Sequence, residues 1–138
     1  MNAQCLLSIE IPMTTAYTLD TNAIIYYAKD DAQATEKLDS IFTESSLIYL
    51  STVSEIELFG FPQFAHEEEE KIEQFLRAVI ILPLNSQIAR IAGSLRKQFG
   101  IKTIDSAVAA TALITRSTLL TRNIRDFKKI PNLSLQNI

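Results

Sequence analysis

Oxygen-bearing side chains follow the apolar runs of this sequence at points where a folded sheet would gather them. These side chains are Asp20, Glu57, Asp105, Asn123 and Asp126. Carboxylates with no basic partner nearby in the sequence repel one another unless a cation joins them. Hard cations such as Mg²⁺ and Mn²⁺ take oxygen ligands and retain some of their water. Such a cation can activate water against a phosphate ester, so the pattern predicts a metal-dependent hydrolytic site.

Asp20 stands where a strand pattern changes to a helical pattern. Residues 17–19 favour a buried strand, and residues 24–28 place apolar side chains at helical spacing. In open α/β sheets, ligands bind at the carboxyl ends of the strands. An isolated Asp at a helix start is more often an N-cap, so a functional role for Asp20 depends on the other acids.

The other acids are expected near the same edge of the sheet. Glu57 lies in the helix after the second strand, and Asp105 lies in the first turn of the helix that leads into the strand at 117–121. Asn123 and Asp126 follow that strand. Four polar neighbours are candidates to orient the acids, or simply to cap helices. They are Thr21, Asn22, Ser106 and Thr121.

The elements that must position these residues alternate between strand and helix. Strands are expected at 17–19, 47–50, 80–82 and 117–121, with a fifth at 133–135. The alternation predicts an α/β fold, a three-layer α/β/α sandwich around a mainly parallel sheet of four to five strands. Thr103 is expected to cap the helix over 104–113. Without a linker or repeat, residues 14–138 should form one domain, after an N-terminal extension at residues 1–13.

Composition excludes several classes of protein. With 47% hydrophobic and 21% charged residues, the chain is an ordinary globular protein. The single Cys5 excludes an internal disulfide and a cysteine zinc site, and three glycines are too few for a Gly-rich nucleotide loop. The single His66 excludes a Ser–His or Cys–His nucleophile. The apolar run at 5–11 is too short to span a membrane and contains Glu10, so we expect a cytoplasmic protein.

The net charge of −3 conceals an asymmetry between the two halves. Residues 1–69 carry two lysines against twelve acids, whereas residues 70–138 carry eleven Lys and Arg against four acids. An acidic site with a basic rim would suit an enzyme acting on a phosphate polymer. The alternative is that both sets of charges are scattered over the folded surface.

Four blocks of sequence follow one another along the chain: Leu19–Asn22, Ser54–Gly60, Thr103–Leu113 and Leu120–Phe127. In this order they resemble the blocks of a PIN domain, with the closest likeness to the VapC-type toxin ribonucleases of bacterial toxin–antitoxin pairs. The resemblance covers about residues 16–136. It implies a Mg²⁺- or Mn²⁺-dependent endoribonuclease, usually a homodimer, that a cognate antitoxin holds inactive.

By position in these blocks, the resemblance makes Asp20, Glu57 and Asp105 the acidic triad that binds metal. The fourth acidic position falls on Asn123, where many relatives have Asp. Asp126 could take its place, which leaves open whether one metal ion binds or two. Basic residues around the last strand are candidates for contacts to the RNA backbone, or are simply solvated. They are Arg116, Arg122, Arg125, Lys128 and Lys129.

Two other classes of protein are alternatives to a PIN-type nuclease. A phosphatase of the haloacid dehalogenase type would need a second Asp where Asn22 stands. A non-catalytic PIN-like module that binds RNA or protein is the remaining alternative. Retention of all three acids argues against it, because a degenerate site has no reason to keep their mutual repulsion.

Overall fold

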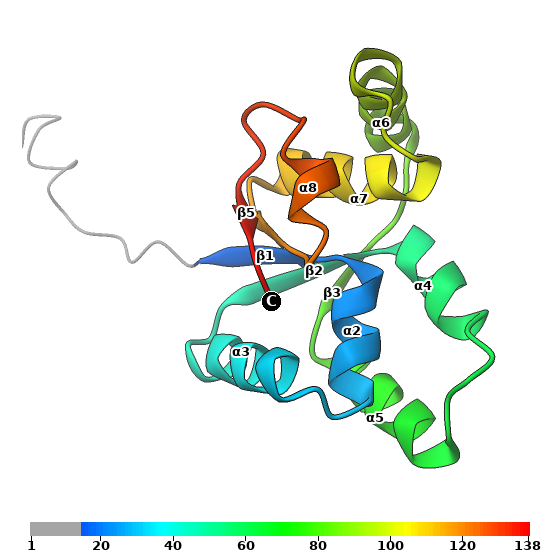
Figure 1. Cartoon of the computed structure of the whole chain (residues 1–138), viewed down its shortest axis with the longest axis vertical. Coiled ribbons are helices and arrows are strands. Elements are labelled where there is room, and N and C mark those ends of the chain that lie inside the picture. Colours follow the sequence, from blue (N-terminus) through cyan, green and yellow to red (C-terminus); the bar gives the residue numbers. More distant parts are fainter. Residues whose placement is uncertain (1–14) are drawn as a thin grey trace, which may run out of the picture.

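The computed structural model describes residues 15–138, so the extension predicted at residues 1–13 lies outside the described residues. Five strands form one sheet in the order β3-β2-β1-β4-β5, and each pair of neighbours is parallel (Figure 1). The strands are β1 (Ala16–Leu19), β2 (Leu47–Ser51), β3 (Ile80–Leu82), β4 (Thr118–Leu120) and β5 (Leu135–Gln136). The predicted α/β fold is confirmed, although β5 is shorter and begins later than the sequence pattern indicated.

Helices cover both faces of the sheet. They are α2 (Thr21–Ala28), α3 (Ala32–Thr43), α4 (Thr52–Phe59), α5 (His66–Arg77), α6 (Ser86–Phe99), α7 (Thr103–Thr115) and α8 (Ile124–Phe127). Helices α2, α3 and α5 lie on one side of the strands, and α6, α7 and α8 lie on the other (Figure 1). Two buried apolar clusters fill the space between the layers. None of the helices in residues 15–138 is both long and apolar enough to cross a membrane.

The register of the central strands places the first acid. Strand β1 pairs with β2 on one side and with β4 on the other, and Leu19 lies opposite Leu120. Both leucines are fully buried, which fixes this register because a one-residue slip would turn them to the wrong face. The next residues along the two strands, Asp20 and Thr121, therefore emerge side by side at the carboxyl edge of the sheet.

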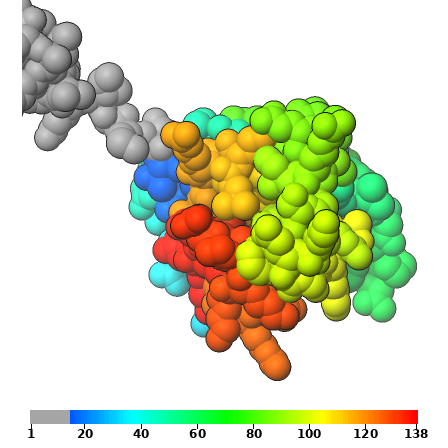
Figure 2. All heavy atoms as spheres, turned by 90° about the horizontal axis from the view of Figure 1, so that it is seen from above, coloured from blue at the N-terminus to red at the C-terminus, as the bar shows by residue number. Residues whose placement is uncertain are grey.

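Helix α7 is buried over most of its length. Every residue from Ser106 to Ala112 is buried, because the small side chains of this segment let the helix lie close to the sheet and to α6. Together α6, α7, α8 and the C-terminal segment cover this face of the molecule (Figure 2). The close packing fixes the first turn of α7, which carries Asp105.

Both ends of α6 follow the sequence signals, whereas the start of α7 does not. The Asn85 side chain caps α6 by accepting a hydrogen bond from the Ile88 amide at 2.9 Å, and Gly100 ends the helix at a φ of 68°. The prediction that Thr103 caps α7 is wrong, because the helix begins at Thr103 and Lys102 occupies the cap position without a side-chain bond. The Thr103 hydroxyl instead accepts a hydrogen bond from Arg96.

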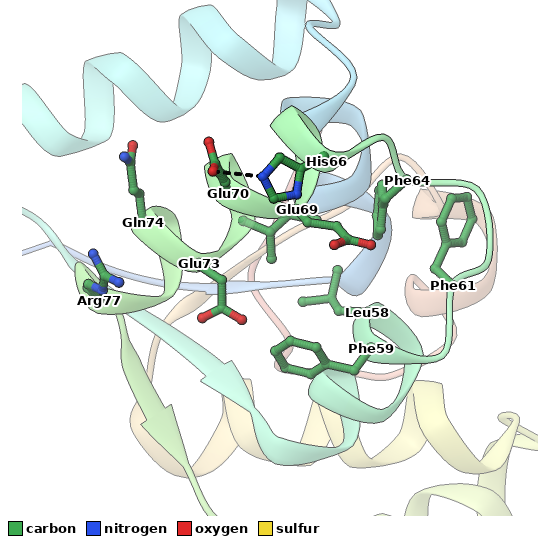
Figure 3. A pocket seen from close by; sticks show the side chains of 11 residues that line it. Leu58, Phe59, Phe61, Phe64, His66, Glu69, Glu70, Glu73, Gln74 and Arg77 are labelled. Carbon is green, nitrogen blue, oxygen red and sulfur yellow. Dashed lines mark ion pairs between the residues drawn. The ribbon is translucent and has the colours of Figure 1, made fainter.

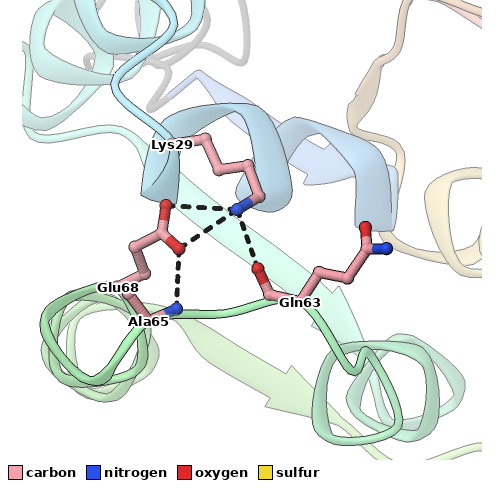
Figure 4. A network of polar contacts seen from close by, with 4 residues as sticks. All are labelled: Lys29, Gln63, Ala65 and Glu68. Atoms are coloured by element: carbon pink, nitrogen blue, oxygen red, sulfur yellow. Dashed lines mark hydrogen bonds and ion pairs between the residues drawn. The ribbon is translucent and has the colours of Figure 1, made fainter.

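Lys29, the residue just after the end of α2, fixes the loop between α4 and α5. Lys29 Nζ donates to the Gln63 carbonyl at 2.9 Å and pairs with Glu68 at 3.1 Å (Figure 4). Glu68 also accepts a hydrogen bond from the Ala65 amide at 2.8 Å, at the start of α5. The ammonium lies 5.5 Å from the ring centre of Phe64. These contacts hold α2, the loop and α5 in one arrangement.

Candidate active site

Asp20 occupies the N-cap position of α2, but its side chain does not cap the helix. Its backbone is extended, with a φ of −68° and a ψ of 146°, and its side chain makes no capping bond to α2. Instead, Asp20 Oδ2 accepts a hydrogen bond from the Thr121 hydroxyl at 2.8 Å. Only 6% of the residue is exposed. The carboxylate is therefore buried at the carboxyl edge of the sheet and held by the neighbouring strand end.

Thr121 joins three segments at this edge. Its amide donates to the Gln136 carbonyl of β5 at 3.1 Å, while its hydroxyl donates to Asp20. The same hydroxyl oxygen accepts a hydrogen bond from the Asn123 amide at 2.9 Å. Because one hydroxyl holds both Asp20 and the start of the following loop, Thr121 orients this part of the site. The sequence predicted a supporting role for Thr121, and these bonds are the contacts through which it would act.

Glu57 reaches the site from α4, which contacts both α2 and α7. Its Oε1 accepts a hydrogen bond from the Thr21 hydroxyl at 2.6 Å. Thr21 directly follows Asp20 in the sequence, so two neighbouring residues connect the two carboxylates. The glutamate itself is exposed, which leaves its other oxygen accessible to a ligand.

The carboxylates are close enough to change one another's ionisation. Burial raises the pKa of Asp20 from 3.8 to about 6, and the charges on Asp105 and Glu57 act in the same direction. Burial also raises the pKa of Asp105, followed by the charge on Glu57 and, more weakly, that on Asp126. The charge on Lys102 opposes this rise. The fold thus places four acids in one electrostatic cluster, although they come from four separate segments.

The oxygen-only ligand set fits a hard divalent cation. Across residues 15–138, no three Asp, Glu, His or Cys side chains converge closely enough to bind one metal ion by themselves. Mg²⁺ and Mn²⁺ do not need such a cage, because they are commonly bound through one or two carboxylates with water completing the shell. The burial of Asp20 beside two other acids disfavours its charged form, and a bound cation would remove that penalty.

Asn123 and Asp126, the two candidates for the fourth position, contact each other. Asn123 Nδ2 donates to Asp126 Oδ2 at 3.0 Å. Both lie at the start of α8, which the fully buried Phe127 anchors to the core. Asp126 also shares a small cavity of about 90 Å³ with Asp105. The sequence treated the two residues as alternatives, whereas the structure links them as a pair.

The remaining supporting residues are placed differently from Thr21 and Thr121. The Ser106 hydroxyl donates to the Thr103 carbonyl of its own helix at 2.6 Å, which is an ordinary bond within the first turn. Asn22 is exposed on the first turn of α2. Neither side chain holds a carboxylate in this arrangement.

The basic residues fall into three groups. Arg125, Lys128 and Lys129 are exposed on or just after α8, near the acids. Arg116 is exposed at the far end of α7 from Asp105, about 16 Å along the helix at 1.5 Å per residue. Arg122 is engaged within the chain by an ion pair to Asp31.

One residue near the site was missed in the sequence. Lys102 lines the cavity shared by Asp105 and Asp126, together with Lys129. It is exposed, and it immediately precedes the first turn of α7. Its spacing of three residues before Asp105, at a helix start, was the available signal, because such residues lie on the same face of a helix.

Comparisons with known proteins identify the family of this chain. The family model described as the PIN domain matches residues 17–133. Ribonuclease VapC2 from Rickettsia felis is 28% identical over 129 residues, which cover 88% of this chain and 96% of that protein.

Solved structures give the same result. The structure of VapBC2 from Rickettsia felis bound to a DNA fragment from their promoter matches with a TM-score of 0.76 and 27% identity, over 90% of this chain and 99% of that one. A toxin–antitoxin complex from Klebsiella pneumoniae matches with a TM-score of 0.71 and 26% identity, over 85% and 94%. The resemblance found in the four sequence blocks is confirmed, and the chain belongs to the PIN-domain family.

Proposed function

We propose that this protein is a Mg²⁺- or Mn²⁺-dependent endoribonuclease that acts in the cytoplasm as the toxin of a toxin–antitoxin pair. The nuclease domain would comprise residues 14–138. The observation that carries the proposal is the burial of Asp20 at the carboxyl edge of the sheet, beside Glu57 and Asp105. A protein gains nothing in stability from gathering these charges, whereas a cation-dependent site requires them.

Each residue of the site has a distinct part in this proposal. Asp20 and Asp105 hold the cation, and Glu57 completes the shell directly or through water. The cation, when bound, activates water and stabilises the charge that develops on the phosphate. Thr121 keeps the Asp20 carboxylate aimed at the site, and Thr21 does the same for Glu57.

The fourth position and the RNA contacts complete the site. Asn123 provides an amide oxygen as a neutral ligand, and Asp126 holds that amide in place through its hydrogen bond. We propose that Arg125, Lys128 and Lys129 contact the RNA backbone, because they are exposed beside the acids. Arg116 is left out of this set because it lies at the far end of α7.

A direct test of the proposal is RNA cleavage by the purified protein. Single-stranded RNA of randomised sequence should be cut with Mg²⁺ or Mn²⁺ present and left intact with a chelator. Asp105→Asn should abolish cleavage while the circular dichroism spectrum stays unchanged. Binding of RNA without cleavage by the wild type, at any metal concentration tested, would favour the non-catalytic module instead.

A groove between α4 and α5 is the surface that we propose for the antitoxin. It has a volume of about 640 Å³, and Glu69 and Glu73 of α5 face Leu58 and Phe59 of α4 across it (Figure 3). Phe59 is 61% exposed, so covering its ring with a partner would remove apolar surface from water.

The acidic residues of the groove and its fixed loop indicate what kind of antitoxin segment would fit. Glu69, Glu70 and Glu73 line its α5 side, so a segment with apolar side chains and several Lys or Arg residues would be complementary. The Lys29 contacts already fix the loop that closes one end, so little ordering is needed on binding (Figure 4). We further expect the toxin to be a homodimer, which light scattering of the purified protein would test.

A further inference from the structure

Arg122 makes three contacts that use both its charge and its planar shape. Its Nε donates to the main-chain oxygen of Ile138 at 2.8 Å, and its Nη2 pairs with Asp31 Oδ1 at 2.5 Å. Its guanidinium carbon, Cζ, lies over the Tyr26 ring at 4.0 Å from the ring centre. The Arg122 side chain is only 30% exposed. This arginine is therefore committed to partners within the chain.

The partners of Arg122 come from separate parts of the fold. Tyr26 lies on α2, the helix that follows Asp20, and Asp31 is the N-cap of α3 through a bond from the Ala34 amide. Ile138 is buried in the same apolar cluster as α2 and α3. Arg122 thus ties the loop after β4 to the helical layer on the opposite side of the sheet from α7.

The position of Arg122 in the chain connects these three contacts to the site. The residue before it, Thr121, donates to Asp20, and the residue after it, Asn123, donates through its amide to the Thr121 hydroxyl. A three-residue segment has few ways to move when its middle residue is fixed at three points. The orientation of the Asp20 carboxylate therefore depends on where Arg122 is held.

We infer that Arg122 is a positioning residue for the metal site, which it serves by holding Thr121 and Asn123 in register with Asp20, and not a contact to RNA. The inference rests on the proposed function, because it assigns a role within the same site. It gives Arg122 a different role from Arg125, whose side chain is exposed and is proposed to contact RNA.

Two substitutions of Arg122 distinguish geometry from charge. Arg122→Ala removes every contact, whereas Arg122→Lys keeps a positive charge but cannot donate in two directions while stacking on Tyr26. If Arg122 served RNA as a charge, lysine would restore function. If Arg122 acts through its three contacts within the chain, lysine would restore little of the lost function.

The experiment measures metal binding, catalysis and RNA binding separately. Mn²⁺ affinity is measured by calorimetry on the purified full chain, and kcat and KM are measured on single-stranded RNA of randomised sequence. RNA affinity is followed against salt concentration. Arg116→Ala is the matched control, because it removes an exposed arginine at the far end of α7. Asp31→Asn is the second test variant, since asparagine preserves the N-cap of α3 but lacks the charge that pairs with Arg122.

For Arg122→Ala we expect Mn²⁺ binding and kcat to fall by about 10- to 100-fold, the usual range for residues that orient metal ligands. The KM for RNA should stay within about twofold, and the salt slope of RNA binding should match that of wild type. Arg122→Lys should show most of the same loss, and Asp31→Asn a smaller loss in the same direction. Should Arg122→Ala fail to fold, Arg122→Lys and Asp31→Asn carry the same comparison.

Other outcomes overturn the inference. Suppose that in Arg122→Ala the slope of log RNA affinity against log salt concentration falls in magnitude by about 0.7, with Mn²⁺ binding unchanged. That result would show that Arg122 contacts a phosphate. Wild-type behaviour of Arg122→Ala, indistinguishable from Arg116→Ala, would overturn the inference alone. A wild type that neither binds Mn²⁺ nor cleaves RNA would overturn the proposed function itself, and the metal-site role with it.

Discussion

Asp20→Asn should stabilise the metal-free protein at pH 7 while removing its response to metal. Asn and Asp have nearly the same shape, and an Asn oxygen can still accept the hydrogen bond from Thr121. The substitution therefore removes one buried negative charge and little else. In the wild type, that charge lies beside Glu57 and Asp105 with only 6% of the residue exposed.

The size of the effect follows from the pKa of the carboxyl group. Burial raises the pKa of Asp20 from 3.8 to about 6, so ionised Asp20 disfavours the folded state at pH 7. At 1.36 kcal/mol per pKa unit, the penalty is about 3 kcal/mol. A gain of this size in Asp20→Asn corresponds to roughly 10 °C in Tm for a domain of this length.

The sign of the pH dependence gives a second measurement. Because the folded state binds the Asp20 proton more tightly than the unfolded state does, stability falls as pH rises from about 4 to about 6. The opposite dependence comes from Asp31, where the hydrogen bond from Arg122 holds the pKa below its usual value. The difference in unfolding free energy between wild type and Asp20→Asn cancels such contributions. It should be small near pH 4 and reach its full value by pH 7.

The assay is urea unfolding in a chelator at several pH values, repeated with Mn²⁺. Metal at a hundredfold excess over its Kd should stabilise the wild type by about 2.7 kcal/mol and leave Asp20→Asn unchanged. Asp39→Asn, at an exposed position of α3, is the matched control and should behave as wild type. If Asp20→Asn were less stable than wild type at pH 7, or if their difference did not vary with pH, the argument that Asp20 is a destabilising buried charge would be refuted.

Three further predictions test the remaining parts of the site. Expression of the wild type without a partner should arrest growth, and Asp105→Asn should relieve the arrest at an equal protein level. In a metal-dependent cleavage assay, Asn123→Ala should lose more activity than Asp126→Ala, because the aspartate acts through the asparagine; the reverse order would make Asp126 the ligand. Phe59→Glu should weaken capture of the cognate antitoxin by more than tenfold, about 1.4 kcal/mol, while RNA cleavage stays unchanged; unaltered capture would place the partner elsewhere.

The sheet could be predicted because its signals are local. The run at Leu47–Leu50 is apolar on both faces, as a covered parallel strand must be, and Gly100 supplies the left-handed residue that ends α6. The start of α7 could not be predicted as reliably, because Thr103 has the type of a cap but its hydroxyl is taken up by Arg96 from the preceding helix. That contact depends on how two helices pack, which no local pattern records.

The candidate acids could be named from the sequence, but what holds them could not. Glu57 receives its hydrogen bond from Thr21, which is 36 residues away, and Asp20 receives its own from Thr121, which is 101 residues away. The β1–β4 register brings the second pair together, whereas the first depends on how α4 packs against α2.

The role of Arg122 could not be predicted from the sequence either. In the sequence, Arg122 is one of five basic residues between positions 116 and 129. An arginine can bind an RNA phosphate or a carboxylate within the chain equally well, so residue type alone does not decide between the two. The fold decides, because it places an N-cap carboxylate, an aromatic face and a main-chain oxygen around this one side chain. Charge type therefore identifies a set of candidates, and only the partners that the topology supplies separate the residue that holds the site from those left free to bind a substrate.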